Sequence, residues 1–172
     1  MTTATSTLGK VHARDIMKRN VFKLEPTSTI DEAVTAFQEL QIGGAPVVDR
    51  SGRLLGVLSS SDIARPENMR SGHVDVQRGD YTMGEASPDD DGSYDEEVVF
   101  SMEDYSPGLL SGTSVADLMN TDVVTVSPDA TLKQIRKQLV KEHAHRVVVV
   151  ERGKLVGIVS TLNVARCVSD SL

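Results

Sequence analysis

An internal repeat is the feature that most constrains how this chain folds. Residues 11–65 and 114–166 follow the same order of residue types, with one extra residue in a turn of the first copy. The clearest matches are Asp15-Ile16-Met17 with Asp117-Leu118-Met119, Val21 to Pro26 with Val123 to Pro128, and Arg53 to Gly56 with Lys154 to Gly157. Self-similarity of this kind predicts two related units that bury an apolar face against each other.

Each copy predicts a strand, a helix, two strands and a second helix. The first strand ends at Pro26 or Pro128, because proline cannot continue a strand ladder. Capping boxes then begin a helix, formed by Thr29 with Glu32 and by Thr131 with Gln134. Apolar residues at helical spacing give these helices a core face: Ile30, Val34 and Phe37 in one copy, Leu132, Ile135 and Leu139 in the other. Two apolar strands with a hairpin turn follow, and a second helix begins after Ser59 or Ser160.

The fold class we predict is α/β (α+β), with two βαββα repeats packed against each other. Strands that are apolar at every position are buried on both faces, so each repeat needs helices on one side and a partner on the other. The obvious partner is the other repeat. The predicted boundaries are a flexible tail at 1–10, repeat 1 at 11–65, an acidic insertion at 66–112 and repeat 2 at 113–172, with both repeats forming one module.

Composition and charge limit the classes of function. The chain has 172 residues and a net charge of −7. No apolar run approaches the ~20 residues needed to span a bilayer, and the polar N-terminus does not resemble a signal peptide. The single cysteine, Cys167, cannot form an internal disulfide and fits a reducing compartment. We therefore expect a cytoplasmic protein that binds neither membrane nor nucleic acid.

Each repeat ends where a buried strand with terminal hydroxyl groups runs into a helix. The stretch from Gly56 to Asp62 in the first copy matches the stretch from Gly157 to Asn163 in the second. Free N–H groups at a helix start can hold an anion, while a carboxylate can accept hydrogen bonds from a sugar diol. The same residues also fit an ordinary junction in which Ser caps the helix and Asp favours its dipole. The residues alone leave both interpretations open.

The ordered set Asp-Ile-Met, Pro-x-x-Thr-Ile, Ala-Pro-Val-Val-Asp and Gly-Val-Leu-Ser-x-x-Asp-Ile, matched in both copies, resembles the cystathionine-β-synthase (CBS) domain. The resemblance covers the two repeats and leaves out the tail and the middle segment. It implies a tandem CBS pair about a pseudo-twofold axis, with clefts that bind AMP, ADP, ATP or S-adenosylmethionine. It also implies a homodimer and a regulatory role toward a partner protein.

The resemblance implies which residues bind the ligand. Ser59 matches a hydroxyl that contacts phosphate, and Asp62 matches a carboxylate that binds the ribose. His145 and Arg146 match basic residues of the opposite repeat, where an Arg can hold phosphate bidentately. The positions that would pack on adenine are Val57, Val123 and Val124, which are equally suited to an ordinary core.

A second, symmetry-related site departs from the family pattern. Asn163, three residues after Ser160, replaces the ribose-binding Asp. Gly43-Gly44 stand where the second copy has the His-Arg pair. Both losses fall on the same cleft because each site mixes the two repeats. We therefore predict one competent site and one weak or empty site, the weak one built around Ser160 and Asn163.

The middle segment, residues 66–112, differs from both repeats. It holds twelve acidic residues against Arg70 and Arg78, and it contains all the tyrosines. A connection this long is usually disordered or functional. One interpretation is a solvated acidic linker. The other is a partner-binding or autoinhibitory flap, in which Val98-Val99-Phe100 and Tyr105 dock on a surface of the protein.

Two functions from different classes follow from the sequence. The first is a regulatory module that senses an adenine nucleotide and passes its occupancy to a partner. The second is a scaffolding module that dimerises and binds no ligand. No catalytic motif occurs, so we do not expect an enzyme. The pair His143 and His145 lacks an accompanying Cys or carboxylate set, so we expect no metal.

Overall fold

The computed structural model of the protein describes residues 10–65 and 105–169. The first half contains α2 (Ala13–Ile16), α3 (Ile30–Leu40), β1 (Gly44–Val48), β2 (Leu54–Ser59) and α4 (Ser60–Ile63). The second half contains α6 (Val115–Leu118), β3 (Thr125–Val126), α7 (Leu132–Lys141), β4 (Arg146–Glu151), β5 (Lys154–Ser160) and α8 (Thr161–Ser169).

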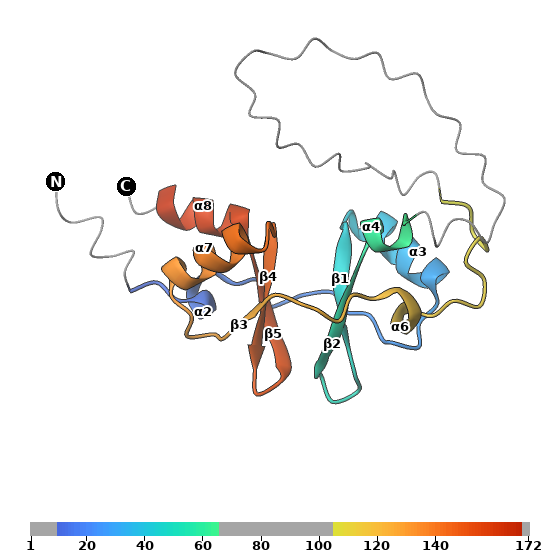
Figure 1. Cartoon of the computed structure of the whole chain (residues 1–172), viewed down its shortest axis with the longest axis horizontal. Helices are drawn as coiled ribbons and strands as arrows, with labels where there is room; N and C mark the ends of the chain where they lie inside the picture. The colour runs from blue at the N-terminus through green and yellow to red at the C-terminus, as the bar shows by residue number, and fades with distance from the viewer. Residues whose placement is uncertain (1–9, 66–104, 170–172) are drawn as a thin grey trace, which may run out of the picture.

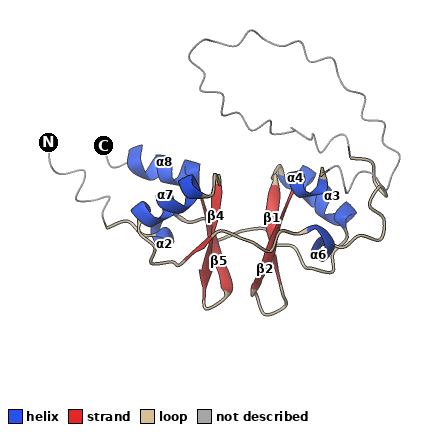
Figure 2. Cartoon of the chain, in the orientation of Figure 1, coloured by secondary structure: helices blue, strands red, loops and turns tan. Residues whose placement is uncertain are grey.

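The architecture has four layers, with two small sheets in the centre and helices on both outer sides (Figures 1 and 2). Antiparallel β1 and β2 form one sheet. The other has the order β3-β4-β5, with β3 parallel to β4 and β4 antiparallel to β5. The α/β class and the paired-repeat architecture predicted from the sequence are thus confirmed.

The first strand of repeat 1 is shorter than the sequence predicts. Leu24 forms only an isolated parallel bridge with Val47, whereas the equivalent segment of repeat 2 forms β3. The predicted capping boxes and core faces of α3 and α7 are present. The buried side chains of these two helices include Ile30, Val34 and Phe37 in α3 and Ile135 and Leu139 in α7, while Leu132 is half-buried.

The two repeats exchange their N-terminal turns, which the sequence analysis did not foresee. The short helix α2 belongs to repeat 1 by sequence, yet Ala13 is buried in the core of repeat 2 and its N–H donates to the carbonyl of Ala130 at 2.8 Å. Reciprocally, α6 packs on repeat 1: Val115 is fully buried in that core and its N–H donates to the carbonyl of Ser28 at 2.8 Å. Sequence repeats and packing units therefore do not coincide.

Two glycines permit this exchange. A Cβ on Gly56 would lie 2.7 Å from the carbonyl oxygen of Asn120, and a Cβ on Gly157 would lie 2.7 Å from the Sδ of Met17. Val57 and Asn120 also exchange N–H···O bonds of 2.8 and 2.9 Å, so the incoming segment pairs with β2. A side chain at either glycine would push the exchanged segment away.

The two sheets meet through a separate apolar cluster between the repeats. Its buried members are Val48 from β1, Val148 from β4 and Leu155 from β5. At one end the hairpin turns join directly, because the N–H of Leu54 donates to the carbonyl of Gly153 at 3.0 Å. The repeats are therefore joined both by an apolar cluster and by a backbone hydrogen bond.

The last residues of the predicted insertion belong to repeat 1. Tyr105 and Leu110 are each 6% exposed and lie in the core of that repeat. The Tyr105 hydroxyl donates to Asp31 Oδ1 at 2.7 Å, and the Gly108 N–H donates to the same oxygen at 3.0 Å. The other docking residues considered above, Val98 to Phe100, lie outside the described residues. Within the described part of the chain, no helix is long and apolar enough to cross a bilayer.

Gly56→Ala should lower the free energy of unfolding by about 1–3 kcal/mol, because the added methyl overpacks against a backbone carbonyl. Gly43→Ala is the matched control, since its Cβ would meet nothing nearer than the Ser60 hydroxyl at 3.8 Å. Chemical denaturation of both variants checks this, and equal effects would contradict the proposed close approach.

Burial, with the hydrogen bond to Asp31, raises the pKa of Tyr105 to about 12. The unfolded chain loses this proton near the ordinary value of 10.0, so its contribution to stability is complete below pH ~10 and is lost as pH rises toward ~12. Tyr105→Phe should lower the free energy of unfolding by about 1–2 kcal/mol at neutral pH and flatten its fall at high pH. Urea titrations across this pH range test both effects, and an unchanged slope would contradict them.

Candidate functional site

The junction between β2 and α4 is closed by a capping box made of two predicted site residues. Ser59 donates its hydroxyl to Asp62 Oδ2 at 2.5 Å, and its N–H donates to the same oxygen at 2.9 Å. The Asp62 N–H donates back to the Ser59 hydroxyl at 3.3 Å. The two side chains therefore act together, as a capping pair that places a carboxylate at the strand end.

Asp62 is buried, with 8% of its surface exposed. It forms an ion pair with Arg65, whose Nη2 lies 3.1 Å from Asp62 Oδ1. The N–H of Ser60 donates to the carbonyl of Gly43 at 2.9 Å. The expectation of free N–H groups at this helix start is therefore wrong for Ser60 and Asp62. An anion that binds here would be held mainly by side chains.

The matching junction between β5 and α8 has the same geometry with a neutral residue. The hydroxyl and N–H of Ser160 donate to Asn163 Oδ1 at 2.8 and 2.9 Å, and the Asn163 N–H donates to the Ser160 hydroxyl at 3.2 Å. An amide thus replaces a carboxylate without changing the cap. The two junctions differ in charge and in hydrogen-bonding capacity, not in backbone shape.

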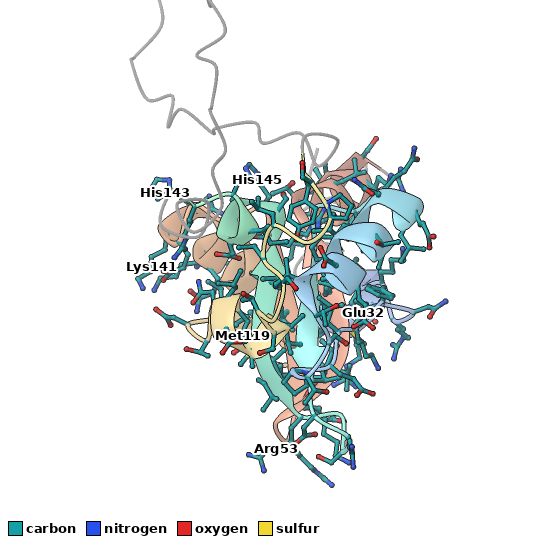
Figure 3. The ribbon with its side chains drawn as sticks, turned by 90° about the vertical axis from the view of Figure 1, so that its right-hand side faces the viewer. Glu32, Arg53, Met119, Lys141, His143 and His145 are labelled. Atoms are coloured by element: carbon teal, nitrogen blue, oxygen red, sulfur yellow. The ribbon has the colours of Figure 1, made fainter. Side chains whose placement is uncertain are left out.

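The basic pair of the predicted site lies at the start of β4. Arg146 pairs with Ser160 in the sheet, and the carbonyl of His145 accepts the N–H of Thr161 at 3.0 Å. Both side chains are exposed, and Figure 3 shows His145 at the opposite end of the molecule from Arg53. His143 has a left-handed φ of 47° where α7 ends, which gives it a backbone role.

The equivalent position in repeat 1 has no room for such a side chain. A Cβ on Gly44 would lie 2.7 Å from the carbonyl oxygen of Leu58 and 3.0 Å from the Cα of Ser59. Gly44 pairs with Ser59 just as Arg146 pairs with Ser160. We call the start of β1 with the end of β2 one rim of the module, and the start of β4 with the end of β5 the other. The two rims are unlike, because Arg146 gives one rim a cation and Gly44 leaves the other without a side chain at that position.

The three valines predicted to pack on adenine fall into two groups. Val57 and Val123, from different repeats, pack against the same inter-repeat cluster. Val124 instead packs against the core of repeat 2, and its carbonyl accepts the N–H of Val148 at 3.1 Å. The structure brings the first two together across the repeat boundary.

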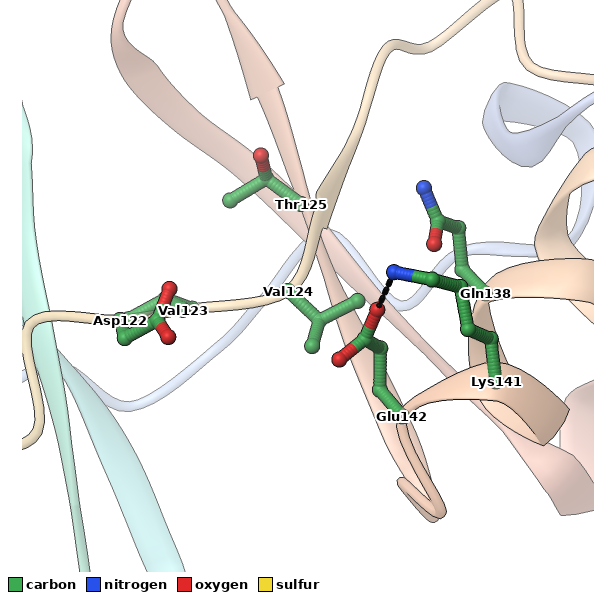
Figure 4. Close-up of a pocket in the computed structure, with 7 residues that line it drawn as sticks. All are labelled: Asp122, Val123, Val124, Thr125, Gln138, Lys141 and Glu142. Carbon is green, nitrogen blue, oxygen red and sulfur yellow. Dashed lines mark hydrogen bonds and ion pairs between the residues drawn. The ribbon is translucent and has the colours of Figure 1, made fainter.

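A cavity of about 240 Å³ opens beside two of these valines (Figure 4). Its lining residues are Asp122, Val123, Val124, Thr125, Gln138, Lys141 and Glu142. Figure 4 shows Gln138, Lys141 and Glu142 reaching in from the end of α7, opposite the segment that leads into β3. The sequence analysis missed these three, because they lie on the far side of the cavity from the motif and match no family position we considered.

The polar wall of this cavity is an ion pair on consecutive residues. Lys141 Nζ lies 2.5 Å from Glu142 Oε1, and the carboxylate raises the pKa of Lys141. Asp122 adds a second carboxylate. The lining is therefore mostly polar, with charged groups and an amide facing Val123 and Val124. Among residues 10–65 and 105–169, no group of three or more His, Cys, Asp or Glu is placed to hold a metal ion.

Comparison with known proteins places both repeats in one family. The model of the CBS domain matches residues 13–66 and 115–170. The protein MJ1426 of Methanocaldococcus jannaschii, described as uncharacterized, is 30% identical over 150 residues, covering 86% of this chain and 84% of the relative. Other curated relatives are longer, and the chain spans 39% and 59% of two of them.

Solved structures agree in fold. CBSX2 in complex with AMP superposes with a TM-score of 0.64 at 22% identity, covering 92% of this chain and 96% of that one. The CBS domain pair of MJ0100, in complex with 5-methylthioadenosine and S-adenosyl-L-methionine, superposes with a TM-score of 0.61 at 18% identity, covering 94% and 98%. With the family model matching both halves and this fold shared, the chain belongs to the CBS domain family.

Proposed function

We propose that this protein is a regulatory module that binds one adenine nucleotide or adenosyl ligand between its two repeats. The observation that carries the proposal is the complementary asymmetry of the two rims. Repeat 1 contributes the buried carboxylate of Asp62, and repeat 2 contributes the exposed cation of Arg146. A nucleotide needs both, a carboxylate for the ribose diol and a cation for the phosphate.

The proposed orientation follows from the chemistry of each wall. The ribose lies at Asp62, and the Ser59 hydroxyl turns from that carboxylate toward the phosphate. His145 and Arg146 approach the phosphate from the other repeat. The base packs on Val57 and Val123, which already share the inter-repeat cluster. This arrangement uses residues from both halves, so one ligand senses their relative position.

The regulatory step is a shift between two relative arrangements of the repeats. A ligand can bias such an equilibrium only by its difference in affinity for the two states. The exchanged turns keep the repeats together, so we expect a small adjustment at the inter-repeat cluster. In related proteins the bound ligands are AMP in CBSX2 and adenosyl compounds in MJ0100, which supports an adenosine-containing ligand here. We propose that this module is not an enzyme. We also propose that it regulates a partner protein and acts in the cytoplasm.

One observation favours the scaffold as an alternative. The capping box and the ion pair with Arg65 already give Asp62 a structural role without any ligand. A scaffold requires the helix cap but not the negative charge of Asp62, whereas nucleotide binding requires both. Removing only this charge therefore distinguishes the two functions.

Asp62→Asn separates the charge from the cap, because Asn163 forms the same cap in the other repeat. Calorimetry with AMP, ADP, ATP and S-adenosylmethionine should detect about one equivalent of one ligand per chain. In Asp62→Asn we expect a loss of affinity of about 10- to 100-fold, the range for hydrogen bonds to a charged group. Asn163→Ala is the control and should bind almost normally.

The outcomes separate the two functions. Binding that survives Asp62→Asn but fails in Asn163→Ala places the ligand at the other junction and refutes the assignment. No binding of any of the four ligands at millimolar concentration favours the scaffold. Thermal denaturation of Asp62→Asn shows whether the cap at this junction remains intact, since Asn163→Ala removes the cap of the other junction.

A further inference from the structure

Helix α7 carries an exposed face that combines positive charge with an apolar side chain. We call the four cations on it, Lys133, Arg136, Lys137 and Lys141, the basic stripe; all four are exposed. Their spacing of three, four and eight residues from the first places them on one side of a helix. The buried residues Ile135 and Leu139 lie on the opposite side.

The basic stripe has almost no partner within the described residues. Helix α7 contains no acidic residue, and only Lys141 forms an ion pair there, with Glu142. Val140 falls within the stripe and is 65% exposed, the largest value among the exposed large hydrophobic residues of the described chain. An exposed aliphatic side chain amid unpaired cations fits a partner that is both acidic and apolar.

The equivalent helix of repeat 1 has the opposite charge. Helix α3 carries Asp31, Glu32 and Glu39 and no Lys or Arg. The two helices occupy corresponding positions on the outer sides of the central sheets (Figure 1). An acidic partner is therefore attracted by one side of the module and repelled by the other.

The chain itself contains a segment with the required chemistry. Asp95-Glu96-Glu97 is followed directly by Val98-Val99-Phe100, so three carboxylates adjoin three apolar side chains. The acidic run matches the cations of the basic stripe, and the apolar run matches Val140. This charge and apolar complementarity selects the segment as the occupant.

The length of the chain indicates that the segment comes from a second copy. Tyr105 is fixed on α3, and Val98 to Phe100 precede it by only five to seven residues, a reach of at most about 25 Å. Layers of secondary structure lie about 10 Å apart, so helices on the two outer sides are about 30 Å apart. The apolar run therefore cannot reach α7 of its own chain.

We propose that residues 95–100 of one copy dock on the basic stripe of another copy, giving a reciprocal dimer. Each exposed ion pair contributes little alone, so the docking depends on the set of cations together with Val140. The interaction weakens with rising salt, because exposed pairs are screened. Three of its cations, Lys133, Arg136 and Lys137, belong neither to the ligand site proposed above nor to the cavity, whereas the fourth, Lys141, lines the cavity.

Zero-length carbodiimide cross-linking tests the docking directly, because it joins a lysine only to a carboxylate in contact with it. An equal mixture of unlabelled and ¹⁵N-labelled full-length chain, at low ionic strength, should give cross-links from Lys133 or Lys137 to residues 95–97. These cross-links should include mixed-isotope pairs. Cross-links found only within one isotope would place the segment on its own chain and overturn the proposal.

Charge reversal gives the second measurement. The variant Lys133→Glu, Arg136→Glu, Lys137→Glu should lose these cross-links and raise the dimer dissociation constant at least about tenfold in analytical ultracentrifugation. The matched control, Lys23→Glu, Arg50→Glu, Lys154→Glu, changes the charge equally at exposed sites and should behave as the wild type. Equal effects of the two variants, cross-links spread evenly over all lysines, or no cross-links at all would overturn the proposal.

Discussion

The reciprocal exchange of the N-terminal turns is the contact on which the rest of the structure depends. Each core is completed by a helical turn from the other repeat, with Ala13 on one side and Val115 on the other. Gly56 and Gly157 allow the exchanged segments to approach the strands within hydrogen-bonding distance. Separating the repeats would break these bonds and expose both cores. The two repeats therefore stay assembled as a pair, and the ligand proposed above would act only on their relative arrangement.

On this nearly symmetric frame, the two strand-to-helix junctions are chemically different. The caps at Asp62 and Asn163 have the same hydrogen bonds, so the backbone of both junctions is alike. The junctions differ in charge, because one cap contains a carboxylate and the other an amide. The starts of β1 and β4 differ as well, because Arg146 has a side chain where Gly44 has no space for one. These differences are why we propose that the nucleotide binds at the Asp62 junction rather than at the Asn163 junction.

What the sequence could predict was local. The capping boxes, the hairpins and the core faces of α3 and α7 depend on residues within a few positions of each other, and they appear as predicted. The exchanged turns and the contact of Tyr105 with Asp31 join residues far apart in the chain, and no local pattern encodes them. For the site, the motif identified Ser59 and Asp62 as neighbours. It could not reveal that they already bond to each other, nor that the end of α7 lines a cavity beside Val123.

The central claim is that one ligand is held jointly by the two repeats, and a crystal structure of the protein grown with AMP tests it most directly. The account predicts a single AMP per chain, with its ribose hydroxyls on the Asp62 carboxylate and its phosphate beside His145 and Arg146. AMP bound instead at Asn163, or held by residues of one repeat alone, would contradict it.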